Sequence, residues 1–272
     1  MGASGRASLL DVDGARLWSG AELAGDSGGR PDGLPDWVRR AYGEFHARLT
    51  DTDDYPCHFG VQAQRSGHNW FAAVARDPGR ADAEALGRAL LSYAERSRSG
   101  PRRQSFVIFA GPPSSPSAED GSGSGATAAA CFWRILSALS SIDPAPWPAG
   151  YSQDTKDPDW QWCFGGAPWF VFAGSPANAV RRSRDFGGCL VLVFQTMRVF
   201  EGLLDTKRSW HAAKDRIRAS LERYDTLPIH PHFGALTDEA SYRWRYAVLP
   251  DDQQVAPAEG CPFQRAPGGP RS

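Results

Sequence analysis

The chain lacks the surplus of basic residues that proteins binding polyanions carry. Its 272 residues include 30 Lys and Arg against 31 Asp and Glu, a formal net charge of −1. Because nucleic-acid affinity depends on neutralising phosphates, this balance argues against nucleic acid as the main partner. The sequence also has no run near 18 apolar residues and no apolar N-terminal h-region. We therefore expect no membrane partner and no signal peptide.

The cysteines form no recognisable metal or disulfide pattern. Their number is odd, they are widely spaced, and no CxxC pair occurs, which argues against a zinc ribbon and a disulfide scaffold. They are Cys57, Cys131, Cys163, Cys189 and Cys261. Reduced thiols favour a cytoplasmic protein. The low-complexity stretch at 111–129 is not a phosphate loop, because no Gly-Lys-Ser/Thr follows it, and we expect a mobile insertion there.

Helical and strand patterns alternate along the chain. Apolar spacing predicts helices over 35–49, 81–96 and 131–140 and around Ile217 and Leu221. Ser175-Pro176 predicts the start of another helix, which carries Arg181, Arg182 and Arg184. Strands are predicted over 56–61, 69–74, 105–110, 157–164, 169–172, 189–194 and 242–249.

This order favours an α+β (mixed α/β) fold. A single domain is expected, with helices packed on a mixed, mostly antiparallel sheet. We assign residues 34–263 to this domain. Residues 1–33 are expected to form a flexible arm and residues 264–272 a flexible tail.

Tryptophan is abundant: the chain has ten, and five lie between Trp133 and Trp169. Such side chains supply large, flat, apolar area with one polar group. They either pack a core or form a wall around a flat ligand. Composition alone does not choose between the two.

Two short segments carry nucleophilic or metal-binding side chains. Neighbouring residues of a strand point to opposite faces, so Cys57 and His58 are not expected to share a site. A thiol enzyme would need another base, such as His230; the structural alternative for Cys57 is a small buried residue. Pro231 between His230 and His232 suits a rigid metal ligand, and a solvated turn is the alternative. No third ligand at recognisable spacing supports a closed zinc site.

Two charged clusters have both a structural and a functional interpretation. The arginines at 181, 182, 184 and 198 either form a solvated face or bind ligand carboxylates. The acidic cluster of Asp154, Asp157 and Asp159 either caps a loop or holds a cationic substrate.

Seven sequence blocks, taken in order, resemble the YqcI/YcgG family over about 56–263. They are PCHFG at 56–60, DPDWQWCFGGAPWFVF at 157–172, SPANAVRRSR at 175–184, FQTMRVFE at 194–201, YDTLPIHPHFG at 224–234, RWRYAVLPDD at 243–252 and CPF at 261–263. The family includes haem enzymes that N-hydroxylate amino acids. One of them acts on the guanidino group of L-arginine in D-cycloserine biosynthesis, giving N-omega-hydroxy-L-arginine.

The resemblance implies a haem-dependent monooxygenase (an iron oxidoreductase) of antibiotic biosynthesis. It would contain a b-type haem and use O2, a small amino-acid substrate and an external electron donor, either a reductase or a ferredoxin. A homodimer is one oligomeric state the sequence allows. Two rival functions stay open: a non-catalytic haem sensor or carrier, and a Cys57-dependent transferase or hydrolase.

The family's motifs, and the haem hypothesis that follows from them, assign roles to several residues. The His-Pro step makes His230 the first choice for binding the iron, with His58 and Cys57 as alternatives. Aromatic strands would cover the porphyrin and carboxylates would hold the guanidinium. The residues so assigned are Arg181, Arg184 and Arg198 for propionates or the substrate carboxylate, Trp160, Trp162 and Trp169 for the porphyrin, and Asp157 and Asp159 for the guanidinium.

The chain departs from the family pattern at two places. Asn178 stands where the family has a histidine at the start of a helix, which removes one ligand. Arg243-Trp244 replaces the usual Glu-Trp, with a shortened spacing to Tyr246, which bears on the substrate.

Overall fold

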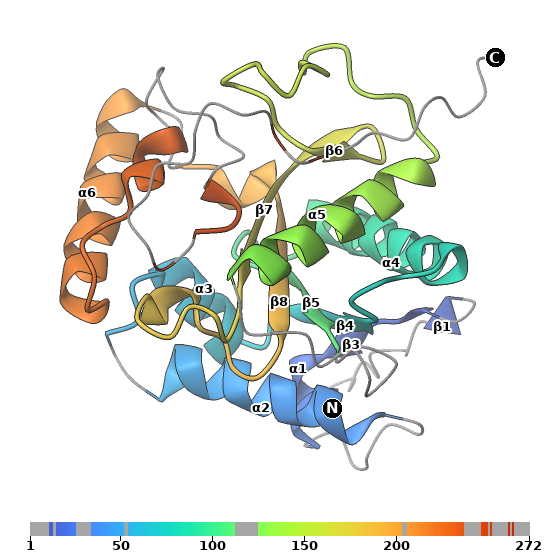
Figure 1. Ribbon diagram of the computed structural model, residues 1–272, viewed down its shortest axis with the longest axis horizontal. Helices are drawn as coiled ribbons and strands as arrows, with labels where there is room; N and C mark the ends of the chain where they lie inside the picture. The colour runs from blue at the N-terminus through green and yellow to red at the C-terminus, as the bar shows by residue number, and fades with distance from the viewer. Residues whose placement is uncertain are drawn as a thin grey trace, which may run out of the picture.

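The computed structural model describes residues 11–12, 15–25, 34–51, 54–111, 125–202, 206–236, 246–249, 251, 261 and 263. Within these residues, six strands form one sheet in the order β3-β4-β5-β8-β7-β6 (Figure 1). The strands are β3 (Trp18–Ser19), β4 (Trp70–Val74), β5 (Phe106–Ala110), β6 (Cys163–Phe164), β7 (Ala167–Gly174) and β8 (Leu190–Thr196). Only the β4–β5 pair is parallel. The expected α+β class with a mixed, mostly antiparallel sheet is confirmed.

Helices cover both faces of this sheet (Figure 1). The α-helices are α1 (Gly20–Ala24), α2 (Asp36–Thr50), α3 (His58–Arg65), α4 (Arg80–Ser99), α5 (Gly125–Ser141) and α6 (Lys207–Tyr224). The remaining elements are the short pair β1 (Asp11–Val12) and β2 (Ala15–Arg16) and the 3₁₀ turns η1 (Arg182–Arg184), η2 (Met197–Phe200) and η3 (Pro231–Leu236).

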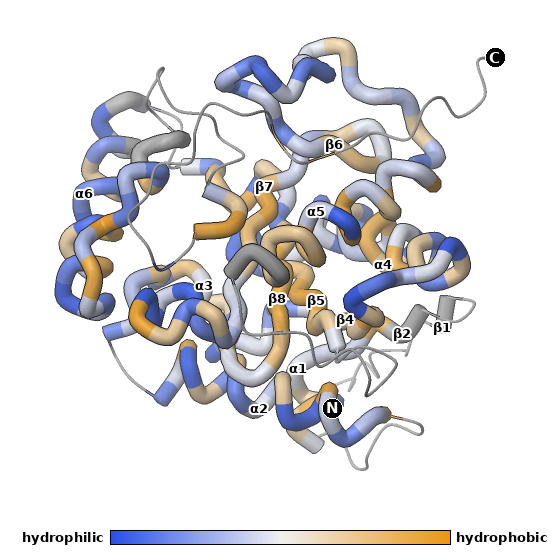
Figure 2. The backbone as a smooth tube through the Cα atoms, viewed as in Figure 1, coloured by the Kyte–Doolittle hydropathy of each residue, from blue (hydrophilic) through white to orange (hydrophobic). Residues whose placement is uncertain are grey.

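Strand alternation divides the core into two layers. In β5, Phe106 and Ile108 pack with α4 and α5, whereas Val107 and Phe109 pack with α1 and α2. Neighbouring strand residues point to opposite faces, and both faces are covered, so β5 is a continuous apolar run. Figure 2 shows hydrophobic residues concentrated in the central strands and hydrophilic ones on outer helices such as α6.

The amphipathic helices form where the apolar spacing predicted them. In α2, Val38, Tyr42, Phe45 and Leu49 are buried along one face, and in α4 the residues at 86, 90 and 93 do the same. Such a stripe buries one face of a helix against the sheet. The strands expected at 69–74, 105–110 and 189–194 correspond to β4, β5 and β8.

Three local predictions are wrong. The segment expected as a strand at 56–61 begins helix α3, with Cys57 as its N-cap. The helix expected after Ser175 is replaced by turns and the single 3₁₀ turn η1. Of the strand expected at 242–249, residues 242–245 lie outside the described part, and 246–249 form turns.

Parts of the expected arm and insertion are ordered elements. Residues 18–25 supply the sheet-edge strand β3 and helix α1, and Trp18 and Leu23 are buried. Apolar contacts with α2 and β4 hold them there. Residues 125–129 of the expected insertion belong to α5. Residues 1–10, 13–14 and 26–33 of the expected arm, 112–124 of the expected insertion and the tail at 264–272 lie outside the described residues.

Candidate functional site

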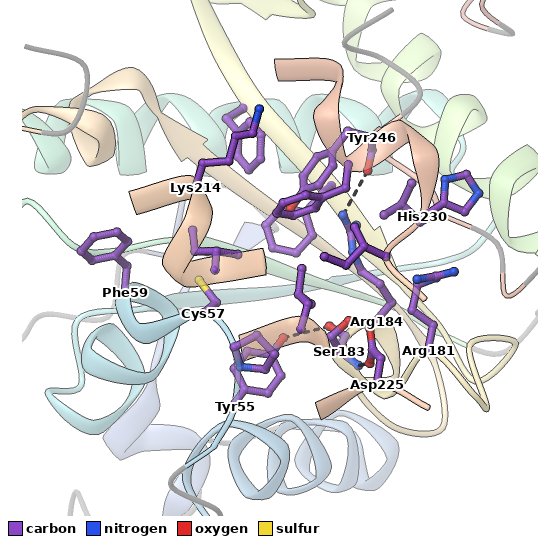
Figure 3. A pocket seen from close by; sticks show the side chains of 18 of the residues that line it. Tyr55, Cys57, Phe59, Arg181, Ser183, Arg184, Lys214, Asp225, His230 and Tyr246 are labelled. Atoms are coloured by element: carbon purple, nitrogen blue, oxygen red, sulfur yellow. Dashed lines mark hydrogen bonds between the residues drawn. The ribbon is translucent and has the colours of Figure 1, made fainter. Parts of the chain in front are cut away.

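A cavity lies on one side of β7, between η1, α6, the start of α3 and the turn at 229–233 (Figure 3). Its volume, taken as the space open to the centre of a water molecule, is about 140 Å³. Most of its lining is aromatic or aliphatic. The apolar members are Pro56, Phe59, Phe170, Phe172, Val199, Phe200, Ala213, Ile217, Leu221, Leu227, Ile229, Phe233 and Leu249, and the polar or ionisable members are Tyr55, Cys57, Arg181, Ser183, Arg184, Gln195, Lys214, Asp225, His230 and Tyr246.

Strand β7 supplies the aromatic wall. Phe170 and Phe172 line the cavity, while Trp169 and Val171 face the opposite core layer. Phe170 and Phe172 contact the Tyr246 ring at centroid distances of 5.6 and 6.4 Å. The three rings therefore form one connected aromatic surface of the cavity.

Arg184 is a buried cation at this wall, with 4% of its surface exposed. Its guanidinium donates to the carbonyls of Ala173 at 2.9 Å and Tyr246 at 3.1 Å. It also lies over the rings of Phe172 and Tyr246, at 4.8 and 4.5 Å from their centroids. A buried charge is tolerated only when such partners replace its hydration. The backbone carbonyls neutralise only part of the charge, so the cavity favours an anionic group.

A buried polar network fixes the backbone next to the two arginines. The Asp225 carboxylate accepts the backbone N–H and the hydroxyl of Ser183, both at 2.7 Å. The Tyr55 hydroxyl donates to the Ser183 carbonyl at 3.0 Å, and burial raises the pKa of this hydroxyl well above its ordinary value. Arg181, 3% exposed, donates to the Pro228 carbonyl. The network therefore ties η1 to the end of α6.

Cys57 stands at the N-terminus of α3. Its Sγ accepts the backbone N–H of Gly60 at 3.4 Å. Burial raises the pKa of the free thiol, and the N–H groups of Gly60 and Phe59 act in the opposite direction. In Figure 3, Cys57 and His230 lie on opposite sides of the cavity. The structure therefore does not assemble the Cys57–His230 pair that a thiol enzyme would need.

His230 is 1% exposed. Its Nδ1 accepts the backbone N–H of His232 at 3.1 Å, and its carbonyl accepts the N–H of Phe233 at 2.8 Å. Both bonds lie in the turn around Pro231. Among the described residues, no three His, Cys, Asp or Glu side chains gather to hold a metal ion.

Four of the residues selected from the sequence meet at this cavity: Cys57, Arg181, Arg184 and His230. The others lie elsewhere. His58 is exposed on α3, and Arg198 bonds to the carbonyls of Ser97 and Gly100.

The expected aromatic cover and acidic clamp do not line this cavity. The tryptophans at 160, 162 and 169 are each 2% exposed and belong to the core layer on the other face of the sheet. Asp157 and Asp159 lie on a surface turn, where the Asp157 carboxylate accepts the Asp159 N–H. Core packing, the alternative interpretation of the tryptophans, is what the structure shows.

Sequence reasoning missed several lining residues, among them Tyr55, Ser183, Lys214 and Asp225. The period-two alternation of Trp169-Phe170-Val171-Phe172 was a usable signal, because it separates two faces. No local signal pairs Ser183 with Asp225, since 42 residues separate them. Asn178 is buried and donates to the Leu249 carbonyl.

Fold and site together define an α+β protein with a ligand cavity of aromatic walls and buried cations. The chain belongs to the YqcI/YcgG family, whose model matches residues 45–264. It is 32% identical over 237 residues to YqcI and 31% identical over 233 residues to YcgG, both uncharacterized proteins of Bacillus subtilis (strain 168). Each alignment covers 85% of this chain and 89% of the relative.

A third relative has a name that states a reaction. The chain is 31% identical over 238 residues to the Streptomyces lavendulae protein named "Putative N(omega)-hydroxy-L-arginine synthase DcsA", covering 85% of this chain and 86% of that one. No solved structure matches the chain. None of the described helices is long and apolar enough to cross a membrane.

Proposed function

We propose that the protein is a haem-dependent N-oxygenase that hydroxylates a nitrogen of an amino acid, with the guanidino nitrogen of L-arginine as the first substrate to test. The name of the third relative supports the reaction, and the cavity's combination of aromatic walls and buried arginines supports the cofactor. An amino-acid hydroxylation of this kind would suit antibiotic biosynthesis of the D-cycloserine type.

The residues at the cavity fit haem by their chemistry. Porphyrin is a flat apolar group with two carboxylates, so it requires apolar walls and cations. Phe170 and Phe172 supply such a wall, and Arg181 and Arg184 supply two buried guanidinium groups suited to carboxylates. Cys57, His230 and the two tyrosines Tyr55 and Tyr246 are the cavity side chains of types that bind haem iron.

Haem, when bound, supplies the redox chemistry with O2, and the protein supplies binding, orientation and exclusion of water. Each turnover replaces an N–H of the substrate by N–OH. The second oxygen atom leaves as water, which takes two electrons and two protons from an external donor such as a ferredoxin or reductase.

The cations also suggest how an amino acid is held. If the two buried arginines pair with haem carboxylates, the third cation of the described lining, Lys214 of α6, would bind the carboxylate of the substrate. Asp225 is the one carboxylate among the described lining residues, and both of its oxygens already bind Ser183. We therefore expect the protein to recognise its substrate mainly through the carboxylate and less through the guanidinium.

The test uses hemin-loaded protein with O2 and a chemical or ferredoxin reductant. Mass spectrometry should show L-arginine gaining one oxygen atom, whereas agmatine, which lacks the carboxylate, should react at least tenfold less efficiently. Lys214→Met should raise the KM for L-arginine about tenfold or more, because one charged hydrogen bond contributes about 1.5–3 kcal/mol. Arg216→Met, an exposed cation on the same helix, is the matched control.

The rival functions give different results. Haem binding without product from any amino acid would favour a haem sensor or carrier. Protein that stays colourless with ample hemin would exclude both haem functions. Activity that needs no haem and disappears when Cys57 is alkylated would favour a thiol enzyme.

A further inference from the structure

The hydrogen bond at His230 determines which ring nitrogen carries the proton. Nδ1 accepts the His232 N–H at 3.1 Å, so Nδ1 presents its lone pair and the neutral ring is protonated at Nε2. A ring nitrogen that carries a proton has no lone pair for iron. This arrangement is the reverse of a metal-binding histidine, whose second nitrogen donates its proton to an acceptor.

The surrounding turn keeps the ring in this state. Iron binding through Nε2 would move the proton to Nδ1, where it would face the His232 N–H as a second donor. The Phe233 N–H already binds the His230 carbonyl at 2.8 Å, and Pro231 restricts the chain between the two histidines. Relieving the two opposed donors would require the His230 ring to give up its bond to the His232 N–H.

Cys57 has the environment that a thiolate ligand needs. Its Sγ lines the cavity and accepts the Gly60 N–H at the start of α3, an eight-residue helix. A helix N-terminus presents partial positive charge, which favours thiolate. Burial raises the pKa of the free thiol, but a metal removes the proton of a coordinating thiol outright. The N–H bond at Sγ is compatible with ligation, unlike the bond at His230 Nδ1.

We infer that the axial ligand of haem in this cavity is the sulfur of Cys57 and that His230 is not an iron ligand; the inference rests on the proposed function. Three features carry it: the N-capped sulfur at the cavity wall, the reversed hydrogen bond of His230 on the opposite wall, and two buried arginines for the carboxylates of the porphyrin. A thiolate also supplies electron density that favours O–O cleavage.

The experiment compares visible, electron paramagnetic resonance and resonance Raman spectra of hemin-loaded wild-type, Cys57→Ser, His230→Gln and Cys131→Ser proteins. Wild-type protein should show a ferrous-carbonyl Soret band at the long wavelength of thiolate ligation. The frequency of the iron–sulfur stretch in the resonance Raman spectrum should shift when the protein is labelled with a heavy sulfur isotope. Cys57→Ser should lose both signatures, and His230→Gln should keep them. Cys131→Ser, a buried cysteine outside the cavity lining, is the matched control.

An imidazole-type spectrum in the wild-type protein, or a thiolate signature that persists in Cys57→Ser, would overturn the inference while leaving the haem proposal standing. Failure of the wild-type protein to bind hemin would instead overturn the proposed function. The isotope shift is measured on wild-type protein, so the inference stays testable even if a variant does not fold.

Discussion

The pair formed by Ser183 and Asp225 should couple the site to the stability of the whole fold. Asp225→Ala removes both hydrogen bonds of the carboxylate, to the backbone N–H and to the hydroxyl of Ser183, each 2.7 Å long and buried. Ser183→Ala removes only the bond to the hydroxyl. The two substitutions therefore remove overlapping sets of interactions.

The hydrogen-bond geometry gives the expected magnitudes. A buried hydrogen bond to a charged group contributes about 1.5–3 kcal/mol, so Ser183→Ala should lower the free energy of unfolding by about 1.5 kcal/mol. Asp225→Ala loses two such bonds but also removes a costly buried charge, and we expect about 3 kcal/mol. The double variant should resemble Asp225→Ala, since the hydroxyl bond is absent in both. The coupling free energy should thus be about 1.5 kcal/mol.

Urea unfolding followed by circular dichroism measures these differences. With a slope of about 3 kcal/mol per molar urea, Asp225→Ala should lower the midpoint by about 1 M. Asp215→Ala, an exposed carboxylate on α6, should change the unfolding free energy by less than about 0.5 kcal/mol. Strictly additive effects in the double variant would refute the shared bond and with it the role of the pair in holding η1.

Two further predictions concern stability. A Cβ at Gly174 would meet the Arg184 carbonyl and the Phe186 ring, whereas one at Gly43 meets nothing within 4 Å; Gly174→Ala should cost about 3 kcal/mol or more and Gly43→Ala should gain about 0.5–1 kcal/mol, measured by thermal melts. Equal effects of the two substitutions on thermal stability would contradict the close approach of Gly174 to the Arg184 carbonyl and the Phe186 ring. Burial raises the pKa of Cys163 to about 12 from 9.0. Above pH 9 the unfolded chain loses this proton first, so stability falls as pH rises towards 12. Cys163→Ala should reduce that slope by up to about 1.4 kcal/mol per pH unit, and an unchanged slope would show that this thiol does not contribute.

Hydropathy patterns correctly predicted the helices and strands whose apolar pattern is regular along their whole length. Helices α2 and α4 appeared where expected because one buried face requires a regular apolar spacing. Strands β5 and β8 did so because burial on both faces makes each a continuous apolar run. The pattern at 56–61 was misleading: Phe59 and Val61 alternate as in a strand, but the segment continues as helix to Arg65, capped by Cys57. Cap geometry and packing against α2 outweigh local propensity there.

The conformation of the short polar segments was not predictable from the sequence pattern. The arginines at 181 and 184 were expected on a helix, yet they reach the cavity from turns that the Asp225 carboxylate and the Tyr55 hydroxyl hold in place. Bonds of this kind join residues far apart in the sequence, and no periodicity encodes them. The same holds for residues 18–25, whose few apolar side chains suffice once β4 and α2 offer a surface.

The sequence by itself determined the α+β class, the main core elements, the likeness to one family and four residues of the cavity. Tertiary structure decided the rest. It placed the tryptophans at 160, 162 and 169 in a core and Phe170 and Phe172 in a cavity, a division set by which face of β7 each helix layer covers. It also brought Cys57, Arg184 and His230 around one space. Ligand chemistry depends on distances between side chains, and those distances exist only after the sheet has paired strands that are far apart in the chain.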